Sequence, residues 1–197
     1  MSILVTGGSG YIGSHMVYEL ADAGERVVVL DNLSAGFDWA VAKGIPLIVG
    51  DTGDQNLVAQ IIREHNVDSI VHFAAWLVVP DSVKDPLGYY KNNTVNSRAL
   101  IETAIKVGVR QFIFSSTCAM YGNPAQVPVT EDTLAAPISP YGWSKLMTEI
   151  MLRDAGTAHD LRYVIYFNVA GADPKCRTGQ STKNATHLIK VAVEAAL

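Results

Sequence analysis

Short apolar runs alternate with longer amphipathic stretches along the chain. Several of the runs are apolar without interruption, which is typical of parallel strands covered on both faces. Strands are predicted at Ile3–Thr6, Arg26–Leu30, Pro46–Val49, Ser69–Phe73, Gln111–Ser115 and Arg162–Tyr166. Because helical stretches separate these runs, the pattern predicts an α/β fold with an open, doubly wound parallel sheet of about six strands.

The stretches between the runs have the apolar spacing of helices. Helices are predicted at Tyr11–Ala23, Gln55–His65, Tyr89–Val107, Tyr141–Ala155 and Ala185–Leu197. Gly24, Gly108 and Gly156 follow three of these stretches. Glycine is the residue that most often ends a helix, so we place three helix ends there.

Composition narrows the class of protein. The chain has 197 residues, of which 49% are hydrophobic, and a net charge of −4, which excludes intrinsic disorder. Its 15 basic against 19 acidic residues disfavour a nucleic-acid partner, and two cysteines do not make a disulfide framework. No apolar run is long enough for a bilayer, and the first strand begins without a signal peptide. We expect a cytoplasmic protein with no membrane partner and, since no ligand cluster has metal spacing, no metal.

A glycine-rich loop joins the first predicted strand to the first predicted helix. Gly7, Gly10 and Gly13 lie in this loop together with Tyr11 and Ile12. Glycines there allow unusual backbone dihedrals, a close approach to a pyrophosphate and tight packing of helix on strand. The helix N-terminus then offers free N–H groups to phosphates. The loop predicts a Rossmann-like dinucleotide site formed by these five residues.

An acidic residue follows the second strand at the distance that such a site requires. Asp31 could accept hydrogen bonds from adenosine ribose hydroxyls and would repel a 2′-phosphate, which favours NAD over NADP. The alternative is that Asp31 only starts a turn with Asn32. Asp51, after the third strand, could bond the adenine amino group or could be a plain turn residue.

A tyrosine and a lysine lie four residues apart on a predicted helix. Tyr141 and Lys145 therefore face the same way. The lysine ammonium, together with a positively charged nicotinamide ring, would lower the pKa of the tyrosine and make it a general acid/base. Upstream, Ser115, Ser116 and Thr117 end the fifth strand, where a hydroxyl could bridge Tyr141 to a substrate oxygen or simply cap the strand.

Six segments occur in the order found in extended short-chain dehydrogenases/reductases. They are TGGSGYIGSH at Thr6–His15, LDNLS at Leu30–Ser34, HFAA at His72–Ala75, FIFSSTCAMYG at Phe112–Gly122, PYGWSK at Pro140–Lys145 and YFNVAGADP at Tyr166–Pro174. Within that family the chain resembles the UDP-glucose 4-epimerases over essentially its whole length.

The resemblance implies NAD-dependent epimerisation at the 4-position of a UDP-hexose. Tyr141 would take the proton from the 4-hydroxyl while tightly bound NAD accepts hydride from the same carbon. The 4-keto sugar would then rotate in the site and receive the hydride on its other face. Thr117, or its neighbour Ser116, would bond the 4-oxygen, and Lys145 would hold the nicotinamide ribose. The resemblance also implies cofactor contacts at Phe73, Asn92, Ser115 and Tyr166 and substrate contacts at Phe167, Asn168, His187 and Leu188.

Related dehydratases carry an Asp-Glu pair after the active-site threonine. Here Cys118 and Ala119 stand at those positions, and neither can move the required proton, which favours an epimerase. Cys118 is expected to be a small buried hydrophobe behind the strand.

Two residues depart from the family pattern. Trp76 would either crowd the nicotinamide pocket or make a subunit or domain contact. Cys176 replaces a glycine and would either add strain of about 1 kcal/mol, if φ is positive, or be a loop thiol with no role.

The resemblance also sets the expected domain organisation. Residues 1–167 would form the NAD-binding domain and 168–197 the beginning of a substrate-binding region that continues past Leu197, so that this stretch alone would be weakly active or inactive. Family members commonly dimerise through two long helices, here Tyr89–Val107 and Tyr141–Ala155. A non-catalytic NAD-binding module and a reductase that releases NADH stay open as alternatives.

Overall fold

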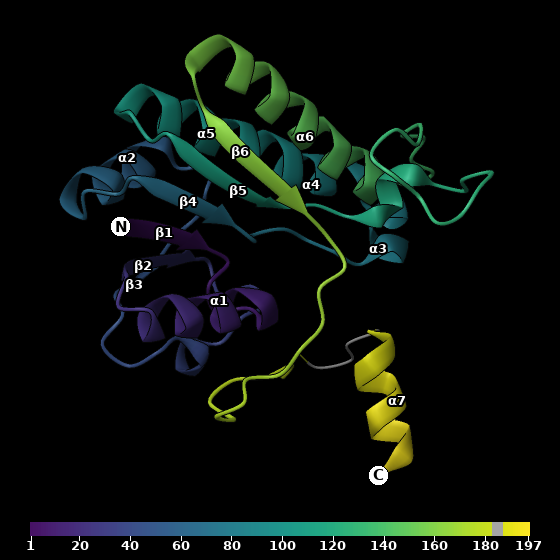
Figure 1. The fold of residues 1–197 in the computed structure, drawn as a ribbon, viewed down its shortest axis with the longest axis horizontal. Helices are drawn as coiled ribbons and strands as arrows, with labels where there is room; N and C mark the ends of the chain where they lie inside the picture. Colours follow the sequence, from purple (N-terminus) through teal and green to yellow (C-terminus); the bar gives the residue numbers. More distant parts are fainter. Residues whose placement is uncertain (183–186) are drawn as a thin grey trace.

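The computed structural model describes residues 1–182 and 187–197. Its centre is a parallel sheet of six strands in the order β3-β2-β1-β4-β5-β6 (Figure 1). The doubly wound α/β fold predicted from the sequence is confirmed. The strands are β1 (Ser2–Thr6), β2 (Arg26–Asp31), β3 (Leu47–Val49), β4 (Ser69–His72), β5 (Gln111–Ser115) and β6 (Arg162–Tyr166).

Helices pack on both faces of the sheet (Figure 1). The helices of the described residues are α1 (Tyr11–Asp22), α2 (Gln55–Glu64), α3 (Val79–Lys84), α4 (Pro86–Tyr89), α5 (Asn96–Val107), α6 (Pro140–His159) and, apart from the sheet, α7 (Leu188–Ala196). Leu4 of β1 belongs to the core formed with α2, α5 and α6, whereas Ile3 and Val5 belong to the core that includes Val17 of α1. Successive side chains of one strand are thus buried on opposite faces, which explains the uninterrupted apolar runs.

One helix end predicted from a glycine is wrong. The helix α6 continues past Gly156 to His159 and ends at Asp160, which has a left-handed backbone with φ +53°. A Cβ at position 156 would lie 2.9 Å from the Leu161 carbonyl oxygen and 2.9 Å from a ring carbon of Tyr163. Gly156 therefore allows the helix to pack closely on the chain that leads into β6, and it does not stop the helix.

The predicted helix at Tyr89–Val107 is a composite element. Helical backbone begins at α4, passes through a π-helical segment at Tyr90–Val95, and continues as α5. The side chain of Asp85 caps α4 by accepting a hydrogen bond from the Gly88 N–H at 3.0 Å. The short helix α3 before it was not predicted.

The helix α7 lies apart from the sheet (Figure 1), and none of its residues is buried. The sequence predicted a start at Ala185, which lies outside the described residues. Between residues 1 and 182 and from 187 onward, no helix combines the length and the apolar character needed to cross a bilayer.

Candidate active site

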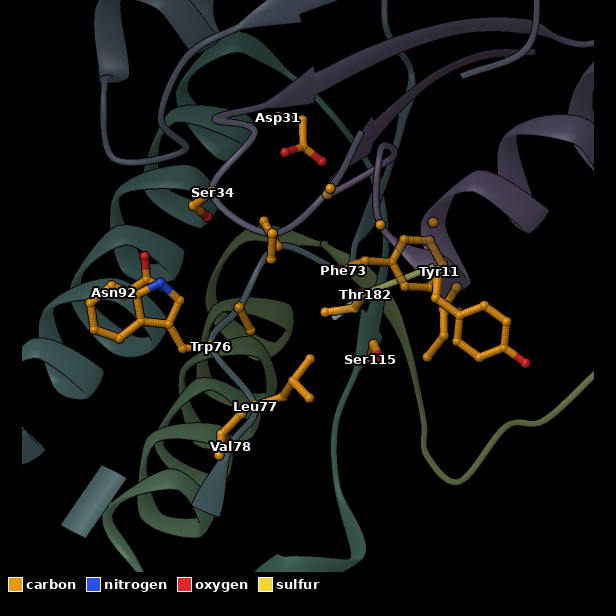
Figure 2. A pocket seen from close by; sticks show the side chains of 18 of the residues that line it. Tyr11, Asp31, Ser34, Phe73, Trp76, Leu77, Val78, Asn92, Ser115 and Thr182 are labelled. Atoms are coloured by element: carbon orange, nitrogen blue, oxygen red, sulfur yellow. The ribbon is translucent and has the colours of Figure 1, made fainter. Parts of the chain in front are cut away.

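A cleft of about 820 Å³ opens at the carboxyl ends of the strands. It lies where the strand order reverses between β1 and β4, the position at which open α/β sheets bind ligands because neighbouring loops diverge there. Figure 2 shows side chains from the loops after several strands around it. The predicted site residues that line it are Gly7, Gly10, Tyr11, Ile12, Gly13, Asp31, Asn32, Asp51, Phe73, Asn92, Ser115, Ser116, Thr117, Tyr141, Lys145, Asn168 and His187.

The glycine loop leaves the N-terminus of α1 open to the cleft. Gly7 turns the chain after β1 with φ +72°, and a Cβ on Gly13 would lie 2.1 Å from the Gly7 carbonyl oxygen. Gly10 caps α1 without a side chain, and the first turn of the helix holds no acidic residue. The free N–H groups and the positive end of the helix dipole are therefore available to an anion such as a pyrophosphate.

Asp31 is buried where β2 ends. Its Oδ2 accepts a hydrogen bond from the Ser9 N–H and its Oδ1 one from the Leu33 N–H, each at 2.9 Å. The carboxylate thus fixes the glycine loop against β2 and also caps the turn through Asn32. A carboxylate has about four acceptor positions, so others remain for hydroxyl groups in the cleft that Asp31 lines.

Asp51 lies at the same end of the sheet, after β3. Its Oδ1 accepts hydrogen bonds from the Gly53 N–H at 2.7 Å and from the Asn96 Nδ2 at 2.8 Å. Asp51 is therefore a turn residue and, in addition, part of the cleft lining. The prediction that Asp51 contacts the adenine amino group stays open beside its role in the turn.

Tyr141 and Lys145 face the cleft from the first turns of α6. The hydroxyl of Ser139 caps this helix by accepting from the Gly142 N–H at 3.2 Å. The Lys145 Nζ donates to the Ser115 carbonyl at 2.8 Å, and burial lowers the pKa of Lys145 to about 7. In the chain alone the lysine is therefore only partly charged at neutral pH.

In the chain alone the pKa of Tyr141 is raised, whereas the lowering expected from the sequence also depends on a positively charged nicotinamide ring. Burial raises this pKa, and a hydrogen bond with the side chain of Thr117 opposes the increase. Lys145, whose ammonium is directed at the Ser115 carbonyl, is not among the groups that shift it. Thr117 and Tyr141 nevertheless present neighbouring hydroxyls to the cleft.

Three predicted site residues do not line the cleft. Tyr166 lies behind it, with its ring 6.2 Å from that of Phe73, and Phe167 packs 6.1 Å from the ring of Tyr121. Leu188 is exposed at the start of α7. Tyr166 therefore supports a cleft residue without facing the cleft, and the structure does not bring the other two into it.

Trp76 lies in the wall of the cleft after β4 (Figure 2). Its ring packs edge-on against Tyr89 at 5.4 Å. Its main chain is held by Asn93, whose Oδ1 accepts from the Trp76 N–H at 2.8 Å and whose Nδ2 donates to the Trp76 carbonyl at 2.9 Å. The same Nδ2 donates to the hydroxyl of Ser144 on α6 at 3.1 Å. Asn93, which sequence reasoning missed, thus connects this wall to the helix that carries Tyr141.

The two cysteines are both exposed. The expectation that Cys118 is buried is wrong, because β5 has already ended and Cys118 begins a 3-10 turn, Cys118–Tyr121. Cys176 has φ +55°, the condition under which strain was expected at this position. In the described part of the chain, no group of three or more histidine, cysteine or carboxylate side chains could hold a metal ion.

Comparisons with known proteins show the family to which the chain belongs. The model of the NAD dependent epimerase/dehydratase family matches residues 3–196. The chain belongs to this family. It is 56% identical over 197 residues to a UDP-glucose 4-epimerase of Azospirillum brasilense, covering 99% of this chain and 57% of that protein.

Solved structures of family members are also similar. A UDP-glucose 4-epimerase from Brucella ovis in complex with NAD has a TM-score of 0.94 and 41% identity over 99% of this chain and 60% of its own. The enzyme from Thermotoga maritima with UDP-glucose has a TM-score of 0.83 and 38% identity over 91% of this chain and 60% of its own. The chain thus spans about three fifths of the length of these relatives.

Proposed function

We propose that the protein is an NAD-dependent UDP-hexose 4-epimerase. The observation that carries the proposal is the convergence of Tyr141, Lys145 and Thr117 on the cleft that the glycine loop opens. The relatives support it, since those compared above are UDP-glucose 4-epimerases, one of them with NAD and another with UDP-glucose.

The cofactor half of the cleft fits NAD. The uncapped N-terminus of α1 would hold the pyrophosphate, Asp31 the adenosine ribose and Lys145 the nicotinamide ribose. The Asp31 carboxylate would repel a 2′-phosphate, so NADP is disfavoured. When bound, NAD would supply the hydride acceptor for sugar C4 and a positive ring charge.

Tyr141 would move the proton in this reaction. Its hydroxyl would remove the proton from the 4-hydroxyl of the sugar and later return it, with Thr117 bonded to the same oxygen and Ser116 beside it. The raised pKa keeps Tyr141 protonated in the chain alone, so added positive charge in the cleft is needed to form the phenolate. Cys118 and Ala119 supply no carboxylate for a dehydration.

The remaining contacts concern the sugar nucleotide. Asn168 and His187 line the cleft and would contact the UDP portion, whereas Phe167 and Leu188, which the resemblance also assigns to the substrate, do not line it. We retain residues 1–167 as the NAD-binding domain and 168–197 as the beginning of the substrate-binding region. These bounds agree with the end of the sheet at Tyr166.

We further propose a homodimer through the composite Pro86–Val107 element and α6. Trp143, Met147 and Ile150 lie on one face of α6 at helical spacing, and each is more than a third exposed. Val95 of the neighbouring π-helical segment is 46% exposed. This apolar surface is the kind that a second copy would cover.

The test combines a native mass spectrum with an assay of UDP-glucose/UDP-galactose interconversion by the full-length protein. We expect two chains with one NAD each, and we expect Tyr141→Phe to abolish turnover while NAD stays bound. Turnover in that variant would exclude Tyr141 as the base. Bound NAD without conversion of any UDP-hexose by the wild type would instead support a non-catalytic module, and NADH accumulating with product would support a reductase.

A further inference from the structure

Glu149 lies one helical turn beyond Lys145 on α6. Tyr141, Lys145 and Glu149 are spaced four residues apart and therefore follow one face of the helix. Glu149 is half-buried and is not among the residues that line the cleft. It cannot contact a ligand there directly, so any effect on the site must pass through its neighbours.

The carboxylate of Glu149 is bonded to the strand end that carries the site hydroxyls. The Ser116 hydroxyl donates to Glu149 Oε1. The Ser116 N–H donates to the Tyr166 carbonyl of β6 at 2.8 Å, so Ser116 is fixed on two sides. The next residue is Thr117, whose side chain lies near enough to Tyr141 to lower the pKa of its hydroxyl. Glu149 thus joins α6 to the segment that must hold Thr117 against Tyr141.

Glu149 is also the anion that acts on the buried ammonium of Lys145. His72 of β4 faces this ammonium, but burial lowers its pKa to about 3, so it is neutral. The Ser115 carbonyl and the Phe114 ring of β5 contact Lys145 and carry no net charge. Among the described residues, Glu149 is the one carboxylate whose charge opposes the loss of the Lys145 proton, in addition to the uncharged Ser115 carbonyl and Phe114 ring.

The groups around Glu149 are compatible with a carboxylate. Tyr121, in the 3-10 turn after β5, faces both Glu149 and Glu131, and burial together with these carboxylates raises its pKa, so it stays neutral. Burial raises the pKa of Glu149, while Ser116 and Lys145 oppose that change. The carboxylate therefore depends on these two partners for its charge.

We propose that Glu149 is a positioning residue of the site, which keeps the Lys145 ammonium charged and holds Ser116, and with it Thr117, in register with Tyr141. The consequence for catalysis rests on the proposed function. The electrostatic effect of Glu149 on Lys145, one helical turn away, does not, and it can be measured in the protein whether or not it epimerises a sugar.

The primary test is competitive acetylation of Lys145 at a series of pH values, read by peptide mass spectrometry on the full-length protein. Glu149→Gln keeps an acceptor for the Ser116 hydroxyl and removes the charge. We expect the midpoint of Lys145 reactivity to fall by about one pH unit. Asp154→Asn is the control, because Asp154 is an exposed acid of the same helix, and it should leave the midpoint unchanged.

A second readout separates this role from a purely structural one. If the charged lysine is required for turnover, the alkaline limb of kcat against pH should move downward in Glu149→Gln, and Glu149→Asp should restore part of the shift. An unchanged midpoint in Glu149→Gln, or an equal fall in Asp154→Asn, overturns the proposal. Failure of the wild type to epimerise would reject the proposed function alone, since the labelling midpoint would still report on Glu149.

Should Glu149→Gln fail to fold, Glu149→Asp carries the test. It retains the charge on a shorter side chain, so the midpoint should fall by less than one pH unit but in the same direction. A midpoint equal to that of the wild type in this variant would contradict the proposal.

Discussion

His72 should make the folded protein sensitive to acid. It is 1% exposed at the end of β4, and its Nδ1 and Nε2 lie 2.6 Å from the Thr6 hydroxyl and 2.8 Å from the Ser97 hydroxyl. Ser97 donates its own proton to the Asn93 carbonyl at 2.5 Å. Because that proton is committed, Nε2 must donate to Ser97 and Nδ1 must accept from Thr6. The network therefore selects the neutral imidazole.

The magnitude follows from the difference between the folded and unfolded states. Burial, aided by the nearby Lys145, lowers the pKa of His72 from 6.5 to about 3. As the pH falls below 6.5, the unfolded chain binds a proton that the folded chain does not, so stability is lost progressively down to about pH 3. Each pH unit in that window costs about 1.4 kcal/mol, a large fraction of a typical stability of about 5–15 kcal/mol.

Urea unfolding of the wild type and of His72→Gln across this pH window measures the effect. The variant should be less stable at neutral pH by about 1–3 kcal/mol, because buried hydroxyls lose their partner. Its stability should fall less steeply with acid, by about 1.4 kcal/mol per pH unit. His159→Gln, at the exposed end of α6, should leave the slope nearly unchanged. Equal slopes in the wild type and His72→Gln would refute the reasoning.

Two further substitutions, each with a control, test the backbone of the glycine loop and of the segment beyond the sheet. Gly13→Ala would place a Cβ 2.1 Å from the Gly7 carbonyl oxygen, so it should destabilise the protein by about 1–3 kcal/mol and remove NAD from the native mass spectrum. Gly179→Ala, where a Cβ would meet nothing within 4 Å, should keep the cofactor, and equal retention by both variants would contradict this account. Cys176→Gly should relieve the strain at φ +55° and raise stability by about 0.5–1 kcal/mol in thermal unfolding. Cys176→Ala keeps the strained backbone and should give no gain, so an equal gain would show that the thiol is responsible.

Local sequence signals predicted most of the sheet because the strands are buried on both faces. The bounds of β5 and β6 agree with those predicted, and β1 and β2 differ by one residue each. The prediction of a helix end failed at a glycine, because glycine can either end a helix or allow another part of the chain to approach the helix closely. Gly156 was interpreted as a helix end, but the chain uses its missing side chain for a close approach to Leu161 and Tyr163. Sequence alone does not show what lies opposite a glycine.

The same limit applies to the candidate site. Motifs on a single loop or helix turn predicted the residues around the cofactor cleft, since the glycine loop and the Tyr141–Lys145 spacing are local. Asn93 and Glu149 were missed because their roles depend on partners from other elements, such as the Trp76 main chain and the Ser116 hydroxyl. Their signal in the sequence was only a polar residue on an otherwise buried helix face.

The spacing of Tyr141 and Lys145 predicted which residues meet but not their charge. The four-residue spacing on a helix determines which side chains are neighbours, whereas the protonation states of those side chains depend on how deeply they are buried. Here burial of the pair lowers the pKa of the lysine and raises that of the tyrosine. Both shifts oppose a lysine cation beside a phenolate, so the mechanism proposed above requires charge from elsewhere. We propose that Glu149 supplies this charge to the lysine and that the cationic nicotinamide of bound NAD supplies it to the tyrosine. The two contributions are separable, because one is removed by a substitution on α6 and the other by removal of the cofactor.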